Sequence, residues 1–191
     1  MLKDKIKLLL VIFYTAIIVG MLAVCLVLMA SIFSKCADAK EIKTDGGYQI
    51  KYGLGLNDPP GASIGSIKQF ALGIQKPAFW VFDYQLEGGA IVDTNVSYGR
   101  KNSAYGSGSL GLNVTMPYLY ADSFWGIAFF SSTDSRLSSF YEFKQDLELG
   151  FRDKRDVRVG ADYCHFSNSG IKLPNFGRDS ILIKLQVPFG K

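Results

Sequence analysis

The sequence predicts an all-β protein, an eight-stranded antiparallel transmembrane β-barrel that follows an N-terminal signal segment. Three observations lead to this fold class. A long apolar run close to the N-terminus indicates export. After it come short stretches in which apolar and polar residues alternate, separated by turn residues, which is the pattern of β-strands. These stretches approach the roughly ten residues that a tilted strand needs to cross a bilayer, and Tyr and Trp gather at their ends.

Residues 1–39 have the layout of a secretory signal peptide. Three lysines lie among the first seven residues, residues 8–33 are almost wholly apolar, and Ala37-Asp38-Ala39 fits a small-x-small cleavage site. The apolar run is long for a signal peptide, so an uncleaved membrane anchor is the alternative. Residues 40–191 then form the outer-membrane barrel domain.

Eight alternating stretches follow the signal, and each predicts one strand. They cover residues 48–56, 70–74, 80–87, 110–116, 125–129, 143–152, 157–167 and 179–189. Several carry charged residues on their second face. A soluble sandwich would alternate in the same way, but export, strand length and the aromatic ends favour a membrane barrel, whose narrow interior side chains can fill.

The connections give an independent argument for the barrel. With both termini in the periplasm, the inner turns fall at residues 75–78, 119–122 and 153–156 and are short. The outer loops fall at residues 57–65, 88–107, 131–138 and 168–178 and are mostly longer. This asymmetry is typical of outer-membrane barrels. Within the second outer loop, residues 95–109 are rich in Gly, Ser, Tyr and Asn, which predicts a mobile segment.

The only histidine of the chain, His165, lies in the seventh stretch together with a serine and close to an acid. His165 and Ser167 share the apolar register of that strand, one pleat apart, and Asp179 begins the apolar face of the next strand. A histidine can take the proton of a serine nucleophile while a carboxylate orients the imidazole. A single histidine at a strand end is more often an interfacial residue, but the serine and the acid in register favour catalysis.

The position of this triad indicates the kind of substrate. The seventh strand runs outward, so the triad lies at its external end and faces lipid at the level of the outer leaflet. In a Gram-negative outer membrane that leaflet is built on lipid A. Polar groups on a lipid-facing surface are costly unless they are paired or functional. The register therefore predicts an esterase that acts on a membrane lipid.

The motif His165-Phe166-Ser167-Asn168-x-Gly170, followed by Pro174-Asn175-x-Gly177-x-Asp179, resembles the signature of the PagL family, the outer-membrane lipid A 3-O-deacylases. A looser likeness in strand layout covers the chain from about residue 40 to its end. The acid of the family is usually glutamate, so Asp179 is a departure. The resemblance implies a serine esterase that removes an ester-linked 3-hydroxyacyl chain from the lipid A of lipopolysaccharide, without a metal or cofactor.

Further residues are candidates for supporting roles. The resemblance implies that Asn168 and Asn175 belong to the site, and with Gly170 they are candidates for oxyanion and loop support. The alternative is that they are turn formers. Lys172, Arg178 and Arg100 lie on predicted outer loops and are candidates for contacts with lipid A phosphates, although solvated loop charges are at least as good an interpretation.

Several other functions are excluded or disfavoured. The formal net charge of +4 does not indicate nucleic acid, and the sequence has no zinc-type spacing, P-loop or dinucleotide fingerprint. Cys164 points to the face opposite His165, which predicts a packed thiol and not a nucleophile. Two alternatives stay open, another lipid esterase or phospholipase on the same scaffold and a non-catalytic structural barrel. The expected partners are lipopolysaccharide and outer-membrane lipids, and a homodimer is left open.

Overall fold

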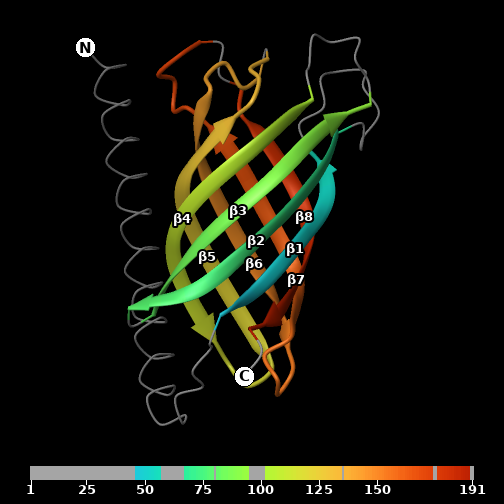
Figure 1. The fold of residues 1–191 in the computed structure, drawn as a ribbon, viewed down its shortest axis with the longest axis vertical. Helices are drawn as coiled ribbons and strands as arrows, with labels where there is room; N and C mark the ends of the chain where they lie inside the picture. Colours follow the sequence, from blue (N-terminus) through green and yellow to red (C-terminus); the bar gives the residue numbers. More distant parts are fainter. Residues whose placement is uncertain are drawn as a thin grey trace, which may run out of the picture. The chain divides into compact units, whose positions relative to one another are not determined.

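The computed structural model describes residues 46–56, 67–79, 81–94, 102–134, 136–173 and 176–189. In them, eight antiparallel strands form one closed barrel in sequence order, with β1 pairing with both β2 and β8 (Figure 1). The strands are β1 (Gly47–Gly55), β2 (Ile67–Phe79), β3 (Phe82–Asp93), β4 (Ser103–Thr115), β5 (Leu119–Phe130), β6 (Tyr141–Arg152), β7 (Arg158–Ser167) and β8 (Arg178–Pro188). The predicted eight-stranded barrel is confirmed. The predicted signal segment, residues 1–39, lies outside the described residues.

The structure corrects the extent of several strands. β3 and β4 reach farther than predicted, so much of the expected outer loop at residues 88–107 is strand, and Gly88 pairs with Gly106. The predicted turns at residues 75–78 and 119–122 are also wrong, because β2 continues to Phe79 and β5 begins at Leu119. Within residues 88–107, glycine and serine favour turns in isolation, but a strand with hydrogen-bonded neighbours on both sides tolerates them. Among the described residues, no helix is long and apolar enough to cross a membrane.

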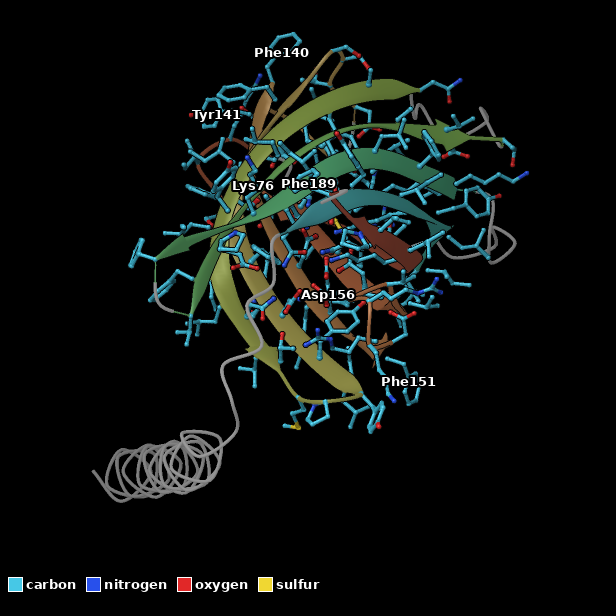
Figure 2. All side chains as sticks on the ribbon, turned by 60° about the horizontal axis from the view of Figure 1, so that its bottom comes forward. Lys76, Phe140, Tyr141, Phe151, Asp156 and Phe189 are labelled. Atoms are coloured by element: carbon cyan, nitrogen blue, oxygen red, sulfur yellow. The ribbon has the colours of Figure 1, made fainter. Side chains whose placement is uncertain are left out.

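Outward-facing strand positions are mostly apolar, and many of the positions that face into the barrel are polar or charged. β6 shows this most clearly, since Leu147, Leu149 and Phe151 are exposed while Asp146 and Glu148 are buried. Figure 2 shows Phe151 projecting away from the barrel wall, as do Phe140 and Tyr141 near the other end of the same strand. Exposed apolar residues around a polar interior are the pattern of a barrel whose outer surface meets lipid.

Ion pairs fill the middle of the barrel. The Nζ atom of Lys51 lies 2.8 Å from carboxylate oxygens of both Glu148 and Asp162, and 3.5 Å from Asp146. Lys184 pairs with Glu148 and Lys144 with Asp146. Asp146, Glu148 and Asp162 are close enough together to hold a metal ion, but the ammonium group of Lys51 lies among them and offsets part of their charge. These charged residues of the barrel interior therefore have a structural role, because paired charges avoid much of the cost of burial.

Toward the end of the barrel that carries the β7–β8 loop, the interior becomes apolar. The rings of Tyr105, Phe130 and Phe166 pack on one another, with centroids 5.1 to 5.5 Å apart. Cys164 and Phe166 are fully buried in this cluster, which confirms the prediction that Cys164 is a packed thiol. Because these two residues anchor β7 from inside, they hold the intervening outward residue, His165, in a fixed register.

Candidate active site

His165 and Asp179 form a directly paired couple on the outer wall of the barrel. They lie opposite each other in the β7–β8 ladder, and Nδ1 of His165 is 2.6 Å from Oδ1 of Asp179. Both side chains are partly covered, with exposed fractions of 33% and 17%. If Nδ1 carries the proton that this carboxylate accepts, Nε2 is the basic nitrogen of the ring. The pair is therefore able to take a proton from a nearby hydroxyl group.

Ser167 shares a pocket with His165. It is the last residue of β7 and lies one pleat beyond His165 on the same outward face. The two side chains, with Ser169, form one side of a pocket of about 520 Å³, and residues of β5 and β6 form the rest. These other residues are Trp125, Gly126, Ile127, Phe143, Lys144 and Gln145. A hydroxyl group, an imidazole and a largely apolar surface thus meet on the outside of the barrel.

Gly177, just before β8, lies against His165 and Ser167. Its φ of +67° is one that other residues rarely adopt, and a Cβ atom there would lie 3.1 Å from Cε1 of His165 and 3.7 Å from Cβ of Ser167. A glycine at this position lets the loop backbone approach the imidazole and the serine together. The sequence signature contains this glycine, but the contact with His165 was not predicted.

Asn168 holds the turn that follows Ser167. Its side chain is buried, and its Nδ2 donates to Oγ of Ser138 at 3.0 Å and to the carbonyl oxygen of Lys172 at 3.1 Å. Its Oδ1 accepts from the backbone N–H of Gly170 at 3.1 Å. Ser169 and Gly170 both have positive φ angles, so the chain turns tightly beside the serine. Asn168 and Gly170 thus lie next to the pocket, and the geometry of the Asn168 amide favours loop support.

The three predicted phosphate contacts have different positions. The guanidinium of Arg178 is buried inside the barrel and donates to Oδ2 of Asp134 at 2.6 Å, so it ties β8 to the β5–β6 loop and does not point to the outer wall. Lys172 is exposed on the β7–β8 loop, where its carbonyl oxygen also accepts from Ser138. Arg100, like the loop candidate Asn175, lies outside the described residues. Figure 1 shows the β5–β6 and β7–β8 loops together at one end of the barrel.

Tyr163 is a member of this constellation that sequence reasoning missed. Its hydroxyl group donates to Oδ1 of Asp179 at 2.6 Å, the same oxygen atom that lies next to the imidazole of His165. The available signal was its register, because Tyr163 precedes His165 by two residues and faces the same side. Alternation alone could not show that the phenol reaches across to β8.

Comparisons with known proteins agree with the sequence motif. The chain matches the family model described as Lipid A 3-O-deacylase (PagL) over residues 68–188. A protein named Lipid A deacylase PagL from Bordetella bronchiseptica is 27% identical over 168 residues, which cover 81% of this chain and 89% of that protein. A crystal structure of the outer membrane enzyme PagL is similar with a TM-score of 0.55 at 18% identity, covering 74% of this chain and 99% of that one. At that identity the structural likeness concerns the fold alone.

Proposed function

Because this chain belongs to the PagL family of lipid A 3-O-deacylases, we propose that it releases a 3-hydroxyacyl chain from lipid A as a serine esterase of the outer membrane. The observation that carries the mechanism is the His165–Asp179 pair, which shares an outward pocket with Ser167. A hydrolytic site on the outer wall of a barrel suits a substrate that is itself a membrane lipid. With the start of β1 and the end of β8 on the periplasmic side, the β7–β8 loop faces outward and the pocket lies at the level of the outer leaflet.

The reaction runs in two acyl transfers. Oγ of Ser167 attacks the ester carbonyl carbon while Nε2 of His165 takes the hydroxyl proton. The tetrahedral intermediate collapses, the C–O bond to the sugar breaks, and the imidazolium returns the proton to the departing sugar oxygen. A water molecule then attacks the acyl-serine ester while His165 takes its proton. The bond to Oγ of Ser167 breaks, the imidazolium returns the proton to Oγ, and the 3-hydroxy fatty acid is released. Asp179 holds the imidazole and stabilises its charged form throughout.

The oxyanion of each tetrahedral intermediate requires fixed hydrogen-bond donors. We assign this role to the tight turn after Ser167, whose backbone is held by the side chain of Asn168. Asn175 is the second candidate, on the strength of the family motif. Lys172, exposed on the same loop, is a candidate for a contact with a lipid A phosphate.

Mass spectra of lipid A test the proposed activity. Cells that express the chain are expected to lose one 3-hydroxyacyl group from lipid A, compared with cells that carry an empty vector. Cells that express Ser167→Ala to the same level in the membrane are the matched control and should retain that group. Unchanged lipid A together with altered phospholipids would favour a phospholipase on the same scaffold, and no lipid change at all would favour a structural barrel.

A further inference from the structure

One oxygen atom of Asp179 accepts two hydrogen bonds. Nδ1 of His165 and the hydroxyl group of Tyr163 each lie 2.6 Å from Oδ1 of Asp179. The two donors come from the same face of β7. The acceptor, Asp179, is the second residue of β8. A carboxylate with two such donors has its orientation fixed, because rotation about its side chain would break both bonds.

The surroundings of Tyr163 explain why its hydroxyl group turns to this carboxylate. In the ladder, Tyr163 lies between Leu147 of β6 and Ile181 of β8, both of them exposed apolar residues of the outer wall. Tyrosines of an interfacial girdle turn their hydroxyl groups to water and head groups. Tyr163 lies four residues inside the strand end at Ser167, roughly 13 Å along β7. At that depth an unpaired phenol is costly, and the carboxylate is its partner.

We propose that Tyr163 is a positioning residue for the deacylation reaction and acts through Asp179. The phenol fixes the carboxylate so that it holds the imidazole of His165 with Nε2 turned toward Ser167. The proposal rests on the proposed function, in which Asp179 orients His165. Tyr163 is not one of the described residues that line the pocket. Its replacement is therefore expected to change the chemical step and not substrate binding.

A double-mutant cycle tests this role. Tyr163→Phe is expected to lower kcat about ten-fold with KM unchanged, because it removes one hydrogen bond to a charged group. In an Asp179→Asn background the same substitution should change kcat by less than about two-fold, because the partner is already lost. Tyr163→Leu also lacks the donor and should give the same pattern. Rates are measured on purified lipid A in detergent micelles.

The matched control is Tyr52→Phe, which removes a hydroxyl group from another exposed tyrosine of the outer wall, on β1. This variant should keep the wild-type rate, and all variants should keep the heat-dependent gel mobility of a folded barrel. Equal losses from Tyr163→Phe in both backgrounds would overturn the proposal, as would a wild-type rate for Tyr163→Phe. The same assay measures deacylation by wild-type protein. A wild-type protein without activity would therefore show that the proposed function fails, whatever the Tyr163 variants do.

A second observation concerns Gln145, a polar residue on the outer wall. Gln145 lies opposite His165 in the β6–β7 ladder, between Trp125 and His165 across three strands, and it lines the pocket. Its outward neighbours along β6 are the apolar residues Phe143 and Leu147. Within the part of the chain that the structure describes, its amide makes no hydrogen bond. A polar amide in a lipid-facing position costs free energy unless it has a function.

The geometry points to Gln145 as a residue that recognises the 3-hydroxyl group of the departing acyl chain, again given the proposed function. The acyl chain extends from the carbonyl at Ser167 toward the middle of the membrane, and the carbon that carries its hydroxyl group is two bonds from the carbonyl carbon. Phe143 faces Ser167 and Gln145 faces His165, so Gln145 lies one pleat deeper than the scissile bond. The amide offers both a donor and an acceptor to a hydroxyl group, and diagonal neighbours across strands lie within reach of a long side chain.

Two synthetic glucosamine phosphate esters test this assignment. One carries a 3-hydroxyacyl chain at the scissile position, and the other carries the same chain without the hydroxyl group. Wild-type protein is expected to prefer the hydroxylated ester by roughly three- to ten-fold in kcat/KM, the effect of one neutral hydrogen bond. Gln145→Leu, which suits the lipid-facing wall, should hydrolyse the two esters at nearly equal rates.

The ester without the hydroxyl group is the internal control, since it lacks the group that Gln145 is proposed to bind, so Gln145→Leu should slow its hydrolysis much less than that of the hydroxylated ester. A preference that persists in Gln145→Leu would overturn the assignment, as would a wild-type protein without any preference. If wild-type protein hydrolyses neither ester and the lipid A spectra also show no loss of an acyl group, the proposed function has failed, and the assignment of Gln145 falls with it.

Discussion

Ser167→Ala and His165→Ala are each expected to lower lipid A deacylation by about three orders of magnitude or more. Without the serine there is no nucleophile, and without the imidazole nothing takes its proton. Both side chains border one pocket, and in the proposed mechanism the imidazole takes the proton of the serine that attacks the carbonyl carbon, so the two residues are expected to act as a unit. The double variant should therefore be little slower than either single variant.

Purified variants in matched detergent micelles are compared by the rate of 3-hydroxy fatty acid release. Ser123→Ala is the matched control. Ser123 also faces outward, on β5, but it is not one of the described residues that line the pocket. The control should keep the wild-type rate. A Ser167→Ala protein that retains the heat-dependent gel mobility and still turns over lipid A near the wild-type rate would rule out serine catalysis at this position.

Asp179→Asn is expected to lower turnover by about two to four orders of magnitude while the barrel stays folded. An amide cannot stabilise the imidazolium, and it can favour the wrong tautomer of His165 by donating to Nδ1. Asp179→Glu should keep substantial activity, because a carboxylate remains opposite His165. The extra methylene group changes the contact of 2.6 Å, so this variant also reports how closely the local backbone is adjusted to aspartate.

Both Asp179 variants are assayed at several lipid A concentrations, so that kcat and KM are separated. A role of Asp179 in orienting the imidazole predicts a loss in kcat for Asp179→Asn and a much smaller one for Asp179→Glu. If Asp179 has only a structural place near the start of β8, both substitutions are mild and similar. Equal, near-normal rates of the two variants would remove Asp179 from the catalytic group.

The fold could be predicted from the sequence because alternation with a period of two survives in nearly every strand. The extents of β3 and β4 could not, because their ends are rich in Gly and Ser. Such residues carry no periodic signal and favour turns in isolation. In the barrel, hydrogen bonds from both neighbouring strands hold them extended, as the pairing of Gly88 with Gly106 illustrates. That contribution comes from tertiary structure and is invisible in a local pattern.

The candidate site divides in the same way. The common face of His165, Ser167 and Asp179 follows from strand register, which the sequence contains. Because Arg178 directly precedes Asp179 on β8, the same register places its side chain inside the barrel, where it donates to Asp134. The reach of Tyr163 to Asp179 depends on a side-chain rotamer and on which residues face each other across β7 and β8. Sequence alone contains neither of these.

The central claim is that Ser167 is the nucleophile of an outward-facing deacylase site, and labelling tests it most directly. A fluorophosphonate with a long alkyl chain is added to the folded protein in micelles, and the labelled protein is digested with trypsin. The adduct is expected on Ser167 within the peptide of residues 159–172, and deacylation should fall in proportion to labelling. His165→Ala should abolish the adduct. An adduct on any other serine, or full labelling of Ser167 with undiminished deacylation, would contradict the mechanism.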